Sequence, residues 1–163
     1  MKNSGKITII VMALSFVSMA FTCTHEDENH HSTIRFINQS DIPIYVEGSG
    51  EYPDTLNLLG MGGGGLSQPQ WHKIYPNSQN ETALQRRSAW ESIFRNKEQI
   101  RSDTLMVYVF DAELLESRTT KLVNTIIQRY DLSLQDLKHV NWTLTYPPSP
   151  NMSAIKMYPP YGQ

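Results

Sequence analysis

The stretch SDTLMVYVFDAELLE, from Ser102 to Glu116, carries the clearest strand pattern in the body of the chain. Its apolar run from 105 to 110 is continuous rather than alternating, which predicts a strand buried on both faces. Asp111 follows directly, where a carboxylate favours capping of a helix. We expect that helix to run from Ala112 to about Ile127. Its apolar residues fall near one helical face: Leu115, Leu122, Val123, Ile126 and Ile127.

Two further β-branched and aromatic runs lie upstream, TIRFI (33–37) and IPIYV (42–46). They flank the turn-forming residues NQSD (38–41), so the sequence predicts a β-hairpin. Ser88 with Glu91, and Ser133 with Asp136, have the spacing of a capping box, which predicts two short helices.

Downstream, NWTLTYPP (141–148) alternates polar and apolar residues, which is typical of a half-buried strand, and AIKMY (154–158) suggests one last short strand. The count reaches about six strands, one amphipathic helix and two short helices. This combination indicates an α+β domain built on a mostly antiparallel sheet or sandwich.

The composition fits one globular domain. The chain has 163 residues, 39% of them hydrophobic, a formal charge of -2 and a pI near 6.2. The acidic balance argues against a nucleic-acid partner. A single cysteine, Cys23, excludes an internal disulfide.

Residues 1–22 differ from the rest. Lys2 and Lys6 precede an apolar run from Ile7 to Phe21 that is shorter than the roughly 20 residues of a membrane-spanning helix. This pattern predicts an export signal, the alternative being an uncleaved anchor. Two cleavage positions remain open. One follows Ala20 and would leave Cys23 as a free thiol; the other lies directly before Cys23.

The second position resembles a bacterial lipoprotein signal, in which the cysteine is acylated and becomes the first residue. The following segment THEDENHH (24–31) resembles the acidic export tag of Bacteroidota surface lipoproteins, with Glu26, Asp27 and Glu28 as its acidic residues. We therefore expect a signal peptide over 1–22, a polar tether over 23–32, and a single domain over 33–163. The histidines of this tether lack the spacing of a helical zinc motif, so no metal site is expected.

No catalytic motif stands out. The acids Asp54, Asp103, Asp111 and Glu113 are the candidates for a dispersed acidic site. The histidines of the body, His72 and His139, read as surface or capping residues. The four glycines at 62–65 lack the Lys-Ser/Thr ending of a phosphate loop, and no role is assigned to the 60–65 loop. No cofactor is expected.

Tyrosine and proline are concentrated near the end of the chain, with Tyr146, Tyr158 and Tyr161 in YPPSP and MYPPYGQ. Such residues suit recognition, because they offer contact area at low ordering cost. The alternative, which we favour, is that the tyrosines pack against the sheet. The tripeptide DTL at 54–56 resembles a Bacteroidota O-glycosylation acceptor, which makes Thr55 a candidate modification site.

The phrases INQSDIPIYV, LMVYVFDAELLE, RYDLSLQDL and NWTLTYPP resemble a set of uncharacterised Bacteroidota outer-membrane lipoproteins. The resemblance implies a lipid-anchored protein of the outer-membrane surface, without an assigned activity. We expect a non-enzymatic binding or accessory module that meets the membrane through its lipid and an envelope protein or glycan through its domain. The alternative is an exported hydrolase acting on glycans or peptides.

Overall fold

A computed structural model describes residues 27–54 and 72–163. Cys23, Glu26, Thr55 and the 60–65 loop lie outside the described residues. The described chain is α+β, as the sequence predicted, with short helices and two sheets. No helix of the described ranges is long and apolar enough to cross a membrane.

Three strands form the smaller sheet, in the order β4 (Ser78–Asn80), β1 (Arg35–Asn38) and β7 (Thr143–Tyr146). β1 runs antiparallel to β4 and parallel to β7.

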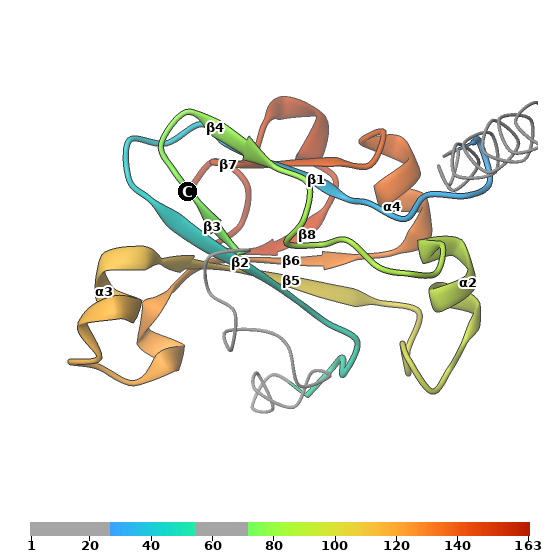
Figure 1. Cartoon of the computed structure of the whole chain (residues 1–163), viewed down its shortest axis with the longest axis horizontal. Helices are drawn as coiled ribbons and strands as arrows, with labels where there is room; N and C mark the ends of the chain where they lie inside the picture. Colours follow the sequence, from blue (N-terminus) through green and yellow to red (C-terminus); the bar gives the residue numbers. More distant parts are fainter. Residues whose placement is uncertain (1–26, 55–71) are drawn as a thin grey trace, which may run out of the picture.

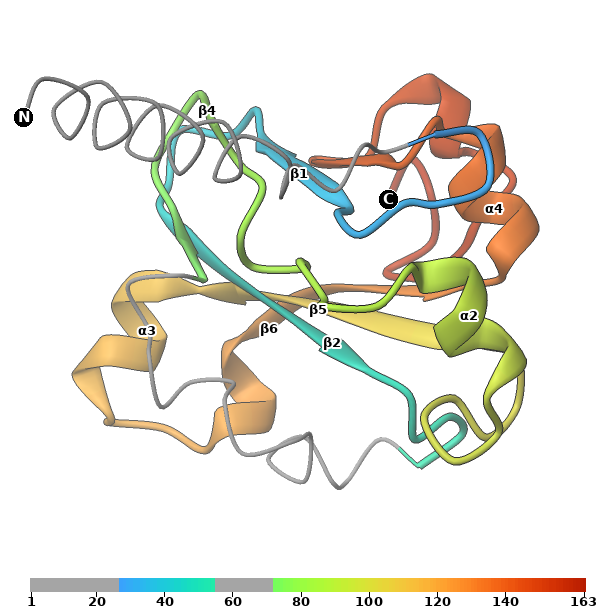
Figure 2. The same cartoon turned by 45° about the vertical axis from the view of Figure 1, so that its right-hand side comes forward.

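The larger sheet is antiparallel throughout. Its order is β3 (Lys73–Ile74), β2 (Ile44–Ser49), β5 (Leu105–Asp111), β6 (Ile126–Leu132) and β8 (Lys156–Tyr158). The two sheets lie face to face, as Figure 2 shows for β1 and β4 over β2, β5 and β6.

The main core fills the space between the sheets. Phe36 and Leu144 of the smaller sheet and Val107 and Tyr130 of the larger one belong to a single apolar cluster and are fully buried. β5 is buried along both faces, as predicted, because Met106, which points away from this core, is buried in a second cluster. Apolar contact on both faces of β5 explains why its run is continuous.

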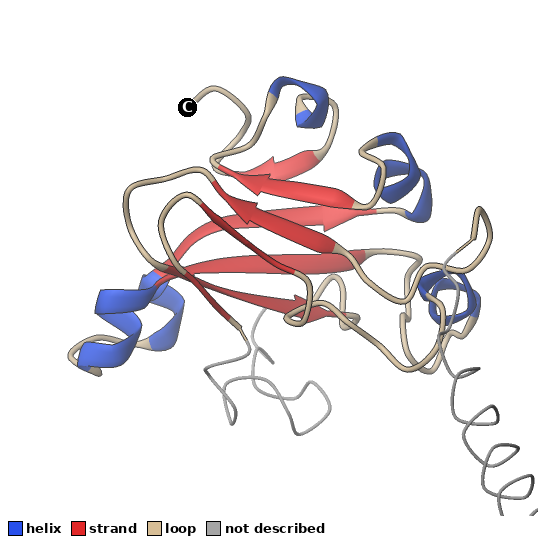
Figure 3. Ribbon diagram, turned by 45° about the horizontal axis from the view of Figure 1, so that its top comes forward, coloured by secondary structure: helices blue, strands red, loops and turns tan. Residues whose placement is uncertain are grey.

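The helices gather at the two ends of the sheets (Figures 1 and 3). α2 (Trp90–Arg95) and α4 (Leu134–His139) lie at one end, and α3 (Ala112–Ser117) lies at the other. Two 3₁₀ turns, η2 (Leu122–Thr125) and η3 (Pro150–Met152), complete the elements.

The predicted hairpin of residues 33–46 is wrong. β1 and β2 flank a turn, but they belong to different sheets. The hydrogen bonds of the Asn38 side chain explain why β1 and β2 lie in different sheets. The Asn38 amide N–H groups donate to the carbonyls of Ile42, Ile74 and Tyr75 at 2.8–3.2 Å. The Asn38 side-chain oxygen accepts from the Ser40 backbone N–H at 3.0 Å. These bonds fix a crossing between the layers in place of a hairpin turn.

The predicted helix over 112–127 is wrong in its second half. α3 begins as expected, with the Asp111 carboxylate accepting from the Leu114 backbone N–H at 2.9 Å. It ends at Ser117, because Arg118 adopts a left-handed conformation with φ of 53°. Residues 126–132 instead form β6, which pairs with β5 and β8. The β-branched Ile126 and Ile127 favour that outcome.

Of the two predicted capping boxes, one is confirmed. Ser133 and Asp136 form the reciprocal bonds at the start of α4. The box at Ser88 is wrong: α2 starts at Trp90 after Ala89, without a side-chain cap. The carboxylate of Glu91 is bonded to His31 instead.

Candidate functional site

A group of charged and aromatic side chains lies on the face of the larger sheet that points away from the main core. We call it the β6–β8 cluster, and it consists of Tyr52, Arg129, Asp131, Lys156 and Tyr158. Arg129 lies opposite Tyr158 in the strand register, and Asp131 lies opposite Lys156. Alternation along β6 places both members of each pair on one face, while Tyr130 between them points into the core.

A buried ion pair anchors this cluster. Asp131 is only 5% exposed, and Arg129 contacts both oxygens of its carboxylate. Nη2–H of Arg129 donates to Oδ2 at 3.2 Å, and Nε lies 2.9 Å from Oδ1. The Nε contact is an ion pair without hydrogen-bond geometry. Two-pronged contact between a guanidinium and a carboxylate fixes the direction of both side chains.

Lys156 lies on the outer side of that pair. Its Nζ is 3.5 Å from Oδ2 of Asp131 and donates to the Tyr52 hydroxyl at 3.0 Å. It also lies 5.2 Å and 5.6 Å from the ring centroids of Tyr52 and Tyr158, within the range of cation–π attraction. The hydrogen bond to the Tyr52 hydroxyl, with a smaller effect of the nearby Tyr158 hydroxyl, raises the pKa of Lys156 above its ordinary value. The ammonium is therefore charged at any physiological pH.

The Arg129 guanidinium lies against the Tyr158 ring, 4.2 Å from its centroid. Tyr158 nevertheless remains 44% exposed, and the Lys156 side chain is 54% exposed. Buried Asp131 thus orients two cations, and the outer one is presented to solvent between two tyrosines. Tyr108, which faces Arg129 from β5, closes the inner side of the cluster, and burial raises its pKa.

A second charged group lies near the start of β3. His72 was expected at the surface, and this expectation is wrong, because the residue is 7% exposed. Its Nδ1 is 3.0 Å from the Val46 carbonyl oxygen and 3.3 Å from Oε2 of Glu47. Burial raises the pKa of Glu47, although the charges of His72 and Arg86 act in the opposite direction. Oε2 of Glu47 accepts no hydrogen bond, which is consistent with an ion pair of poor geometry.

A third group fixes the N-terminal end of the described chain. The His31 ring stacks on Trp142 with centroids 4.2 Å apart, and its Nδ1 lies 2.6 Å from Oε1 of Glu91. The His31 backbone N–H donates to Oε2 of the same carboxylate at 3.1 Å, and the His31 carbonyl accepts from Trp90 at 2.7 Å. The packed body therefore begins by His31, which the sequence had placed in the tether.

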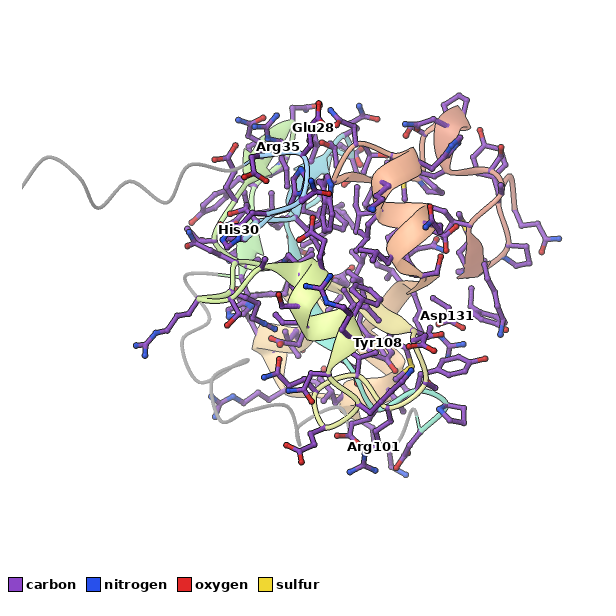
Figure 4. All side chains as sticks on the ribbon, turned by 90° about the vertical axis from the view of Figure 1, so that its right-hand side faces the viewer. Glu28, His30, Arg35, Arg101, Tyr108 and Asp131 are labelled. Atoms are coloured by element: carbon purple, nitrogen blue, oxygen red, sulfur yellow. The ribbon has the colours of Figure 1, made fainter. Side chains whose placement is uncertain are left out.

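The remaining residues of the expected export tag lie just before this point. Asp27 and Glu28 are exposed and belong to a turn in which the backbones of Asp27 and His30 hydrogen-bond to each other at 3.1 and 3.3 Å. Figure 4 shows Glu28, His30 and Arg35 on one side of the molecule and Tyr108, Asp131 and Arg101 on the other.

Two of the acids considered for catalysis, Asp103 and Asp111, lie at opposite ends of β5. Asp111 caps α3, and Asp103 is ion-paired with Lys97 at the other end of β5. β5 itself spans about 20 Å at a rise of roughly 3.4 Å per residue, well beyond the roughly 5–10 Å that separates the carboxyls of a glycosidase. Glu113 is exposed in the first turn of α3, and Asp54 is exposed after β2. His139 is exposed at the end of α4.

Within residues 27–54 and 72–163, no group of three or more His, Cys, Asp or Glu side chains is arranged to hold a metal ion.

The β6–β8 cluster was missed from the sequence because residues 126 and 127 were assigned to a helix. An alternating strand interpretation of IIQRYDL would have placed Arg129 and Asp131 on one face. Of the tyrosines near the chain end, Tyr158 and Tyr161 are exposed, whereas Tyr146 is half-buried against the core. The favoured alternative of packed tyrosines therefore holds for Tyr146 alone.

Comparison with known proteins gives no relatives: no family model, no curated protein and no solved structure matches this chain.

Proposed function

We propose that this protein is a lipid-anchored component of the outer-membrane surface, acylated at Cys23, whose domain binds a partner without catalysing a reaction. The anchor rests on the sequence: a short apolar run, a lone cysteine, and the acidic residues Glu26, Asp27 and Glu28 behind it. These features resemble Bacteroidota surface lipoproteins. An acyl chain contributes about 0.8 kcal/mol per buried methylene, so several chains give a stable anchor.

The observation that carries the binding role is the solvent-facing part of the β6–β8 cluster. Tyr158 and Lys156 are half-exposed, yet Arg129 and the buried Asp131 hold them in place. A side chain that is ordered before binding loses little entropy when a partner arrives. Tyrosine and arginine are also the residue types that dominate binding energy at protein interfaces.

The anchor is tested by the mass of the N-terminal peptide of the native protein from isolated membranes. We expect a diacylated or triacylated Cys23, absent from the Cys23→Ser variant. An unmodified chain beginning at Phe21 overturns the anchor. Replacing Glu26, Asp27 and Glu28 with alanine should leave acylation intact but reduce cleavage of the protein by protease added to whole cells.

The binding role is tested by chemical cross-linking on intact cells, with comparison of Tyr158→Ala and Tyr75→Ala. Both residues are exposed tyrosines, but Tyr75 lies after β3 and outside the cluster. We expect a discrete cross-linked partner that Tyr158→Ala removes and Tyr75→Ala retains. Equal cross-linking in both variants would show that the cluster is not the binding surface.

A further inference from the structure

His31 contacts two elements of the domain through one flat ring and two N–H groups. Its ring stacks on the indole of Trp142, which follows α4, with the ring planes only 13° apart. The ring nitrogen Nδ1 lies 2.6 Å from Oε1 of Glu91 in α2, and the His31 backbone N–H donates to Oε2 at 3.1 Å. An ionised carboxylate only accepts hydrogen bonds, so Nδ1 carries a proton.

This arrangement is the one that a guanidinium makes with a carboxylate and an aromatic ring. Two N–H groups reach the two oxygens of Glu91, one each, while a planar group lies on the indole of Trp142. Arginine binds carboxylates through such a two-pronged contact and stacks on aromatic faces. His31 therefore occupies the position that an arginine side chain would take.

The Glu91 carboxylate depends on this contact. Its side chain is only 5% exposed. Of the residues that the structure describes, only His31 forms a salt bridge or a hydrogen bond with the Glu91 side chain. A buried carboxylate without a donor is costly, so the site requires a replacement when His31 leaves.

The Trp142 indole is positioned by bonds that do not involve His31. Trp142 and Asn141 both adopt a left-handed conformation, with φ of 56° and 49°, which is rare for a bulky residue. The Trp142 backbone N–H donates to the Leu137 carbonyl at 2.8 Å, and the Trp142 carbonyl accepts from the Arg35 N–H at 2.9 Å. Strained backbone of this kind is concentrated at sites that hold ligands.

His31 is also easy to displace from its place in the chain. In the described part of the chain, the hydrogen bonds of residues 27–30 join these residues to one another, so His31 is the first residue bonded to the body. Its side chain is 20% exposed. Terminal segments open at the lowest free-energy cost, so a competing side chain can replace His31 without unfolding the domain.

We infer that Glu91 and Trp142 form a recognition site for an arginine side chain of a partner protein, and that His31 occupies this site when no partner is bound. A lysine ammonium fits less well, because it is a compact charge without a flat face. An arriving arginine replaces His31 and frees the N-terminal segment. The site is separate from the β6–β8 cluster, since Figure 4 shows His30 and Asp131 on different sides of the molecule.

The test uses the purified full-length protein in detergent micelles at pH 7, with N-acetyl-arginine amide as the probe and N-acetyl-lysine amide as the comparison. We expect the arginine probe to bind His31→Ala at least about tenfold more tightly than it binds the parent. A site that its own side chain fills has an apparent affinity reduced by the fraction that is open. Calorimetric titration measures both affinities.

Two further variants show where the probe binds. His31→Ala combined with Glu91→Gln should bind the arginine probe at least about tenfold more weakly than His31→Ala alone, because a charge-assisted hydrogen bond is lost. His30→Ala is the matched control and should bind as the parent does, since His30 hydrogen-bonds to Asp27 through its backbone. Melting temperatures confirm that each variant is folded at the temperature of the titration.

Displacement of His31 has a reading of its own. The His31 amide hydrogen is bonded to Glu91 and should exchange with solvent faster when the parent is saturated with the arginine probe. Unchanged exchange of this amide at saturation overturns the displacement.

Three affinity results overturn the inference as well. Equal affinities of His31→Ala and the parent show that His31 does not occupy the site. Equal binding of the arginine and lysine probes to His31→Ala shows attraction to charge alone. Equal binding with and without Glu91→Gln places the probe elsewhere. The proposed function fails separately, through an unmodified Cys23 or through cross-linking that Tyr158→Ala leaves unchanged.

Discussion

Glu47 and Glu91 are both buried glutamates in contact with a histidine, yet the protein shifts the pKa of their carboxyls in opposite directions. Burial acts on both and raises the pKa. At Glu91 the side chain and backbone of His31 donate to the carboxylate and outweigh burial, so its pKa is lowered from 4.5. At Glu47 burial prevails over the charges of His72 and Arg86, so its pKa is raised.

For Glu91, a folded pKa below the unfolded one means that the ionised carboxylate stabilises the fold above about pH 4.5. This contribution is lost as the pH falls through the lowered folded pKa. We expect Glu91→Gln to lower the free energy of unfolding by about 1.5–3 kcal/mol at pH 7, with the difference shrinking below pH 4.5. Urea unfolding across this pH range measures it, with exposed Glu98→Gln as the control. Identical urea midpoints at pH 7 would contradict the contact with His31.

For Glu47 the sign is reversed. A folded pKa above the unfolded one means that folding disfavours the ionised form, so the penalty is present at high pH and disappears below about pH 4.5. Glu47→Gln should therefore leave the urea midpoint at pH 7 unchanged or raise it, and any gain should vanish toward pH 4. A fall in midpoint as large as that of Glu91→Gln would show that the ion pair with His72 is net stabilising.

At the scale of single elements, the sequence predicted correctly the features that depend on a few neighbouring residues. It failed where residues distant in the sequence contact the segment. The caps at Asp111 and Ser133 involve residues at most three apart in the chain. The pattern at Ser88 is equally good in sequence, but His31, 60 residues away, takes the Glu91 carboxylate. The prediction of a helix over 112–127 is wrong for a related reason. The apolar residues near its end have helical spacing, but the pairing of β6 with β5 overrides that preference.

The two capping patterns give a direct comparison. Ser133→Ala removes a hydroxyl that accepts from the Asp136 backbone N–H at 3.1 Å, and we expect it to lower the free energy of unfolding by about 1 kcal/mol. Ser88→Ala should change it by less than about 0.5 kcal/mol, because Ser88 is exposed and α2 has no side-chain cap. Thermal unfolding of both variants measures the difference. Equal losses would mean that the Ser88 box forms in solution.

At the scale of the whole molecule, the sequence predicted the α+β class and a mostly antiparallel arrangement, but it missed how the layers are divided. β1 pairs with β7, more than 100 residues later, and no local pattern specifies such a pairing. The same limit hid the β6–β8 cluster, whose members come together only when β6 and β8 are paired and the loop after β2 approaches them.

A buried hydrogen bond of Tyr130 joins the two layers through the core. Tyr130 of β6 donates from its hydroxyl to the Thr145 carbonyl of β7 at 2.8 Å, and Tyr130 is fully buried. Tyr130→Phe keeps the ring and removes this bond, so we expect a loss of about 1–2 kcal/mol in urea unfolding. Tyr75→Phe, at an exposed position, is the control. An unchanged midpoint for Tyr130→Phe would show that this hydrogen bond contributes nothing to the stability of the fold.

The attachment of His31 to Glu91 and Trp142 sets a limit on reach. If Cys23 carries the lipid, seven residues separate the anchor from the fixed histidine, and the eight steps from Cys23 to His31 cover at most about 29 Å when fully extended. The linker would then hold the domain close to the bilayer. It would be too short to carry the domain beyond a thick layer of surface polymer. Under the proposed function, a partner would be another component of the membrane surface or a molecule that has already crossed that layer.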